Sequence, residues 1–163
     1  MRRFAIATAL VAVVGLIGAG TTLAGGEHGR GHRGLTFTST EAAFAAIPVT
    51  AGKFSVGDRV AFSDDVFASK GGEQVGTDGG SCTTVRVTDA ASASGVLQCL
   101  VTFDLPGGQI TTQALNTLTN GGFAGAQTGA ITGGTGRFRD ASGQFTVEFL
   151  SGGATNLTFF LDT

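Results

Sequence analysis

Hydrophobic and polar residues alternate along this chain from residue 35 onward, in short runs rich in valine, threonine and phenylalanine. Clusters of glycine, aspartate, asparagine and serine separate the runs, a pattern typical of β-strands joined by tight turns. The third strand is expected to break at Asp78-Gly79-Gly80, and Glu41–Ile47 (EAAFAAI) is expected to form a short helical turn. The alternation predicts eight strands, which are Leu35–Thr40, Arg59–Ser69, Gln74–Thr77 leading into Cys82–Thr88, Gly95–Leu105, Gln109–Thr119, Gly125–Thr132, Gln144–Ser151 and Thr155–Asp162.

Eight strands joined by tight turns, in a chain of 163 residues, predict one all-β domain: an eight-stranded antiparallel β-barrel. Closure of the sheet removes the exposed strand edges that would otherwise invite aggregation. The interior of such a barrel has room for one small ligand or for packed side chains. Residues expected to fill it by alternation are Leu97, Val101, Phe103, Phe145, Val147, Phe149, Leu157, Phe159 and Leu161.

The N-terminus has the pattern of a secretory signal peptide. Arg2 and Arg3 precede an uncharged apolar run, and small residues before Gly25 favour cleavage after Ala24. A retained anchor helix is the alternative, because the run is about as long as the shortest membrane span. We therefore expect a signal peptide at 1–24, a flexible Gly/His-rich leader at 25–34, and a barrel domain at 35–163 that is secreted and has no membrane attachment.

Composition and charge exclude several classes of function. The formal charge is −2 and charged residues make up 13% of the chain, so no basic surface suits nucleic acid. Histidine is absent from the barrel region, which excludes a Ser-His-Asp triad there. No cluster has metal-ligand spacing, and the sequence indicates no metal and no cofactor.

The two cysteines, Cys82 and Cys99, are expected to form a disulfide, because export leads to an oxidising compartment. A turn within Asp89–Ser94 would place them opposite each other on adjacent strands. Two free thiols, one of them facing a ligand, are the alternative.

Three segments occur in an order and spacing similar to those of the allene oxide cyclase and dirigent protein superfamily. They are VGDRVAFSDDVF (Val56–Phe67), VGTDGGSCTTVRV (Val75–Val87) and AITGGTGRFRDASGQFTVEF (Ala130–Phe149). The last contains a match to the signature GGTG-x-F-x-x-A-x-G. No Lys-Ser/Thr follows GGTG, so it is not a P-loop, and we interpret it as a structural corner whose Phe138 plugs one barrel end. The resemblance implies an eight-stranded barrel with a hydrophobic cavity.

The resemblance also suggests site residues. Allene oxide cyclases use a first-strand glutamate, asparagines and a pocket cysteine; Cys82 matches the cysteine and Asp64 takes the place of an asparagine. The glutamate position falls at Thr36, so the catalytic carboxylate of the first strand is expected to be absent. Dirigent barrels use aspartates and arginines, which makes Asp64 and Arg86 the candidate catalytic residues. If both face inward they form a buried pair; otherwise Asp64 and Asp65 both reach water.

These observations favour an exported barrel that binds a hydrophobic small molecule and steers its stereoselective cyclisation or coupling, as an isomerase or cyclase does. A non-catalytic extracellular carrier of lipids or hydrophobic metabolites, and a solidly packed structural barrel, are the alternatives. The resemblance further implies a homo-oligomer, a dimer or a trimer, formed through the outer face. The candidate substrate-binding residues are Phe62, Cys82, Phe103, Phe145 and Phe159.

Overall fold

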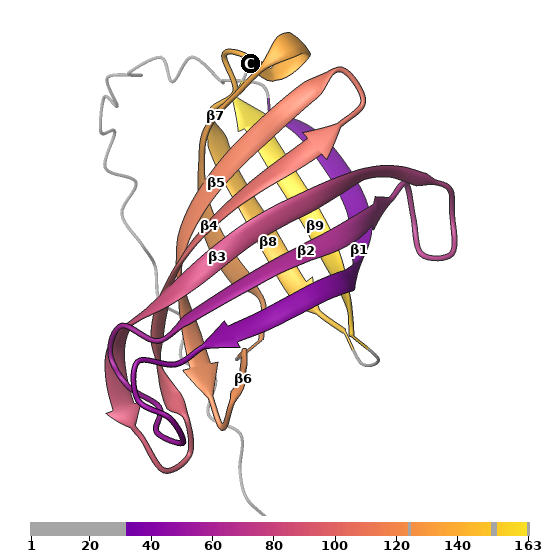
Figure 1. Cartoon of the computed structure of the whole chain (residues 1–163). Helices are drawn as coiled ribbons and strands as arrows, with labels where there is room; N and C mark the ends of the chain where they lie inside the picture. Colours follow the sequence, from indigo (N-terminus) through magenta and orange to yellow (C-terminus); the bar gives the residue numbers. More distant parts are fainter. Residues whose placement is uncertain (1–31, 124, 151–152, 163) are drawn as a thin grey trace, which may run out of the picture.

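The computed structural model describes residues 32–123, 125–150 and 153–162, which form an all-β structure (Figure 1). The predicted signal peptide and the leader up to residue 31 lie outside the described residues. In the described part, no helix has the length and apolarity needed to cross a membrane. The elements are β1 (His32–Ile47), β2 (Arg59–Phe67), β3 (Gln74–Asp89), β4 (Ser94–Leu105), β5 (Gly108–Thr119), β6 (Gly122–Phe123), β7 (Gln127–Gly134), the 3-10 turn η1 (Gly136–Phe138), β8 (Gly143–Phe149) and β9 (Ala154–Asp162).

Eight long strands close into an antiparallel barrel, which confirms the fold class predicted from the sequence. Each long strand pairs with the next one along the chain, while the two-residue β6 adds only a short ladder to β5. The first and last strands, β1 and β9, close the barrel, with Leu35 opposite Phe159. Since every long strand has two neighbours, none of them leaves an open edge.

The first strand extends beyond both of its predicted ends. Residues Glu41–Ile47 continue β1 and pair with β2, so the predicted helical turn is wrong. Alanine favours a helix locally, but here the ladder to β2 prevails. A bulge between Glu41 and Ala43 adds one residue, which keeps both Glu41 and Phe44 on the inner face. Residues 32–34, assigned to the leader, pair with β9 and belong to this strand as well.

The third strand is continuous through the glycine pair at which a break was predicted. Asp78 pairs with Asp64 on β2, and Gly80 pairs with Phe62. A Cβ atom on Gly80 would lie 2.8 Å from the Phe62 ring and 2.8 Å from the Leu100 carbonyl oxygen. The glycine therefore marks a close approach of a neighbouring side chain rather than the end of a strand.

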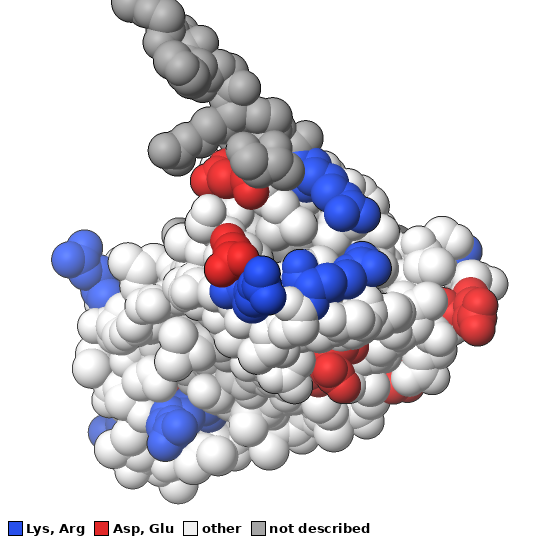
Figure 2. Space-filling model, turned by 90° about the horizontal axis from the view of Figure 1, so that it is seen from above, with Lys and Arg blue, Asp and Glu red and all other residues white. Residues whose placement is uncertain are grey.

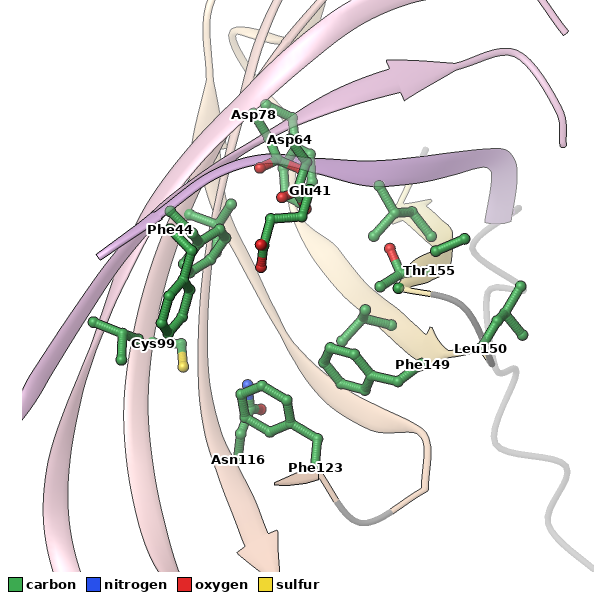
Figure 3. A pocket seen from close by; sticks show the side chains of 18 of the residues that line it. Glu41, Phe44, Asp64, Asp78, Cys99, Asn116, Phe123, Phe149, Leu150 and Thr155 are labelled. Atoms are coloured by element: carbon green, nitrogen blue, oxygen red, sulfur yellow. The ribbon is translucent and has the colours of Figure 1, made fainter. Parts of the chain in front are cut away.

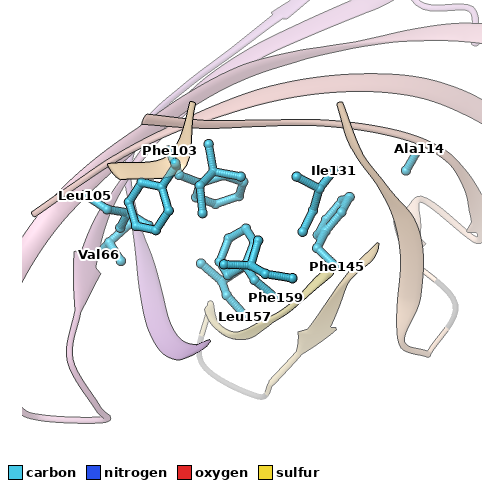
Figure 4. Packing of buried hydrophobic residues seen from close by; sticks show 11 residues of the cluster. Val66, Phe103, Leu105, Ala114, Ile131, Phe145, Leu157 and Phe159 are labelled. Atoms are coloured by element: carbon cyan, nitrogen blue, oxygen red, sulfur yellow. The ribbon is translucent and has the colours of Figure 1, made fainter. Parts of the chain in front are cut away.

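The half of the barrel nearer η1 is filled by an apolar core (Figure 4). Phe159 is fully buried at its centre, and its ring meets that of Phe103 edge-on at a centroid distance of 4.9 Å. The buried members of this cluster come from β2, β4, β5, β7, η1, β8 and β9. They are Val66, Phe103, Leu105, Ile110, Ala114, Ile131, Phe138, Phe145, Leu157, Phe159 and Leu161. The packing fixes this half of the barrel, whereas the opposite half contains a cavity and a smaller buried cluster of Cys82, Leu97 and Cys99.

The GGTG segment forms the expected corner at the filled end. Gly133 and Gly136 have φ angles of 154° and 58°, which glycine adopts without strain. Gly134 has no positive φ, but a Cβ there would meet the carbonyl oxygens of Gln109 and Phe138. Phe138 is 5% exposed and closes the end of the core.

Charged side chains surround this closed end on the outside. Arg33, Arg137 and Arg139 border a shallow hollow together with Asp140 and Asp162. Figure 2 looks onto this end and shows basic and acidic side chains side by side on an otherwise mostly uncharged surface. Arg137 lies over the Phe138 ring, with 4.7 Å between its guanidinium carbon and the ring centroid.

Candidate functional site

The open half of the barrel contains a cavity of about 310 Å³ (Figure 3). It lies between the later part of β1, the early part of β2, the middle of β4 and the residues Leu150 and Gly153 that flank β8 and β9. Most of its lining is apolar, and its polar side chains are few. The lining residues are Glu41, Phe44, Val60, Phe62, Asp64, Asp78, Cys99, Val101, Phe103, Asn116, Phe123, Phe145, Val147, Phe149, Leu150, Gly153, Ala154, Thr155 and Leu157.

Three carboxyl groups enter this cavity from three adjacent strands. Glu41 on β1 pairs with Asp64 on β2, which pairs in turn with Asp78 on β3. Figure 3 shows the three side chains directed into the same region of the cavity. Like charges at directly opposite positions of a sheet destabilise it, so a row of this kind costs stability and is a candidate for a functional site.

Asp78 is the most deeply buried of the three, with 6% of its surface exposed. Among the described residues, its Oδ1 atom has no hydrogen-bond partner. Burial, and then the negative charge of Asp64, raise the pKa of Asp78 from 3.8 to about 7. At neutral pH this carboxyl group therefore exists in both the protonated and the ionised form, as a group that exchanges protons requires.

Asp64 is held in place by neighbours on the cavity wall. The Ser39 hydroxyl donates to Asp64 Oδ2 at 3.2 Å, and Ser39 Oγ lies 2.6 Å from Thr155 Oγ1. Burial raises the pKa of Asp64, the Ser39 hydrogen bond lowers it, and the charges of Glu41 and Asp65 raise it further. The net shift is upward, in the same direction as that of Asp78.

The wall opposite the carboxyl groups combines an amide with aromatic rings. Asn116 on β5 is 6% exposed, and its Oδ1 has no partner among the described residues. The rings of Phe123 and Phe149 stack at a centroid distance of 4.5 Å with 14° between their planes. A ligand in the cavity thus meets flat apolar surfaces and one unsatisfied amide oxygen.

The two cysteines form the predicted disulfide between paired positions of β3 and β4. Cys99 borders the main cavity, whereas Cys82 borders a second cavity of about 250 Å³. Phe44, Val60 and Phe123 line both, so the two cavities adjoin. The disulfide therefore braces the wall that the cavities share.

The sequence matches the model of the allene oxide cyclase barrel-like domain over residues 35–156, most of the chain. The chain belongs to this family. No match was found among curated protein sequences.

Solved structures similar to this allene oxide cyclase barrel-like protein include several enzymes. A pyocyanin demethylase has a TM-score of 0.68 and 29% identity, over 79% of this chain and 99% of that one. A pterocarpan synthase dirigent protein has a TM-score of 0.62 and 20% identity, over 81% and 83% of the two chains. The Diels-Alderase AbmU from Streptomyces koyangensis has a TM-score of 0.61 and 14% identity, over 84% and 71%. The last two likenesses concern the fold alone.

In this allene oxide cyclase barrel-like protein, Arg86 does not form the expected buried pair with Asp64. Arg86 is exposed and does not line the main cavity. The β3–β4 register shifts between Thr84 and Arg86, so one extra residue turns Arg86 outward while Thr84 stays buried. The position on β3 that pairs with Asp64 holds another acid, Asp78.

The first strand nevertheless brings a carboxyl group to the cavity, at a position that the family resemblance did not suggest. Thr36, to which the family's glutamate was assigned, is exposed. Glu41, five residues further along the same strand, lines the cavity instead. The signal for it was an acidic residue at the start of EAAFAAI, which becomes informative only once that segment is recognised as a strand.

The predicted substrate-binding residues fall into three groups. Phe62, Phe103 and Phe145 line the main cavity, and Cys82 lines the adjoining one. Phe159 is buried in the core and borders neither of the two. No group of His, Cys, Asp and Glu within the described ranges has an arrangement suited to a metal ion.

Proposed function

We propose that this protein binds an apolar small molecule in the open half of its barrel and promotes a ring closure or rearrangement of that molecule. Asp78 would exchange a proton with the bound molecule during the reaction. One observation carries the proposal: a buried carboxyl group, whose pKa is raised to about 7, borders an otherwise apolar cavity of about 310 Å³.

The cavity suits such a reaction in its size and in its walls. Its volume lies at the lower end of the range for small-molecule sites, and the adjoining cavity of about 250 Å³ extends it. Phe62, Phe103 and Val147 offer rigid apolar contacts that would hold a flexible ligand in one shape. Restriction of this kind lowers the entropic part of a barrier to ring closure.

Each polar residue would have a separate part. Asp78, protonated in a fraction of the molecules at neutral pH, would donate its proton to a basic or electron-rich atom of the ligand and regain it from the product. Ser39, through its hydrogen bond, would fix the orientation of the Asp64 carboxyl beside it. The 29% identical pyocyanin demethylase supports the view that a barrel of this type performs enzymatic work on a small molecule.

We also propose that the protein is exported. The disulfide between Cys82 and Cys99 is compatible with an oxidising compartment. The sequence pattern of residues 1–24 supports a signal peptide in front of the barrel.

The test begins with native mass spectrometry of the protein purified from its own secretion, followed by organic extraction. The extracted compound, or hits from a panel of polyenes, phenols and polycyclic aromatics, is then incubated with wild type, Asp78→Asn and the distant control Asp140→Asn. We expect wild type and the control to convert the ligand, and Asp78→Asn to bind it without conversion. Binding without conversion by wild type would establish a carrier, and no binding at all would refute the ligand cavity.

A further inference from the structure

The side chains that line the main cavity include acids but no bases. Three of its residues are acidic, and none of its lining residues is lysine, arginine or histidine. Within the described ranges, no arginine or lysine forms an ion pair with any of the three acids. We propose that the ligand is a hydrophobic organic cation, in which an aromatic part carries a positively charged nitrogen. This inference rests on the proposed function of the cavity and names its class of substrate.

The row of acids itself favours a cation. Glu41, Asp64 and Asp78 occupy directly paired positions, so each ionised group raises the energy of the next. Part of this repulsion is removed when a positive charge is placed among them, most strongly beside Asp78, which is buried. A ligand carboxylate would add a fourth acid and would find no basic partner to offset its desolvation.

Two buried acceptor atoms point to the same class of ligand independently of the net charge. Asp78 Oδ1 and Asn116 Oδ1 both border the cavity, and neither has a hydrogen-bond partner among the described residues. Buried polar atoms without partners are rare in native structures and indicate a missing group. Both atoms accept hydrogen bonds and attract positive charge, so a hydrogen-bond donor or a cationic centre of the ligand would satisfy them.

The apolar lining also suits a cation with a flat frame. The stacked rings of Phe123 and Phe149, together with Phe44 and Phe62, border the cavity. Aromatic faces attract organic cations in addition to burying their apolar surface. An aliphatic anion such as a fatty acid would use the apolar surface only.

A charge series on constant frames tests the inference. The probes are 10-methylacridinium, anthracene and anthracene-9-carboxylate, with 1-methylquinolinium, naphthalene and 1-naphthoate as a smaller set. Dissociation constants for the mature, disulfide-bonded protein are measured at pH 8 by fluorescence and calorimetry. We expect the cation of one frame to bind at least about tenfold more tightly than its neutral analogue, and the carboxylate to bind most weakly.

The outcomes separate this inference from the proposed function. Equal or tighter binding of the neutral or anionic probes would overturn the cation preference and leave the ligand cavity intact. Failure of all six probes to bind would overturn this inference, while the proposed function would still be decided by the wider ligand panel. Tighter binding of the cation than of its neutral analogue, with either frame, would support both this inference and the proposed ligand cavity.

Variants show whether the acids cause the preference. Asp64→Asn and Glu41→Gln are each expected to weaken binding of the cation about tenfold and to leave the neutral probe unchanged. Asp140→Asn, whose side chain is 88% exposed beside the closed end, serves as the matched control and is expected to change neither. Equal losses for cation and neutral probe would indicate a structural effect and refute the assignment.

Discussion

The raised pKa of Asp78 predicts an unusual pH dependence of stability. The folded state favours the protonated acid up to about pH 7, whereas the unfolded chain releases this proton near pH 3.8. Between these values the folded state binds more protons, so stability falls as pH rises. Each pH unit in this window removes up to about 1.4 kcal/mol, and the loss between pH 5 and pH 8 amounts to about 2.5 kcal/mol.

Urea unfolding of wild type and Asp78→Asn at pH 5, 6, 7 and 8 measures this effect. Asparagine has nearly the shape of the protonated acid and does not titrate, so the difference between the two free energies of unfolding isolates Asp78. We expect wild type to lose stability across this range relative to Asp78→Asn, with the steepest change between pH 5 and 7. Asp140→Asn is the control for an exposed carboxyl group and should follow wild type.

Parallel curves for wild type and Asp78→Asn would refute the reasoning. They would mean that Asp78 titrates at the same pH in the folded and unfolded states, as a solvated carboxyl group does. The proton-exchanging role of this residue would then lose its physical basis.

Three further predictions concern the scaffold and the cavity. Reduction of the Cys82–Cys99 disulfide, which spans 17 residues, should lower the free energy of unfolding by about 3 kcal/mol, measured by urea titration with and without reductant; unchanged stability would contradict this. Phe159→Ala should cost about 3–5 kcal/mol in the same titration, because its side chain is fully buried, and a loss below 1 kcal/mol would show that the core collapses around it. Val60→Phe should fill space where the two cavities adjoin and weaken ligand binding at least about tenfold in calorimetry, with Val85→Phe on the exposed outer face as control.

The strand alternation was sufficient to predict the strands, because a period of two is set by the backbone and does not depend on distant contacts. The resemblance carried by the GGTG segment supported the closure of these strands into a barrel. Most strand ends agree within two residues. The extension of β1 through Glu41–Ile47 could not be predicted in this way, because alanine-rich segments favour helices until a neighbouring strand pairs with them.

The polar residues of the cavity were harder to predict, since two β-bulges decide which side chains face inward. The extra residue before Arg86 turns that arginine outward, and the one after Glu41 keeps Phe44 in the cavity. Asp78 was missed because the glycines that follow it suggested a break in the strand. Only the register with Phe62 shows that Gly80 makes room for that ring.

The separation of a filled half from a hollow half has an evolutionary consequence. Residues that hold the barrel together, such as Phe159 and Ile110, are fully buried near the closed end. Residues that shape the cavity, such as Phe44 and Phe149, are substantially exposed at the opposite end, so their substitution removes less packing. Substitutions that change ligand specificity therefore leave the fold largely intact. Descendants of one ancestral barrel of this design can in this way come to act on chemically unrelated molecules.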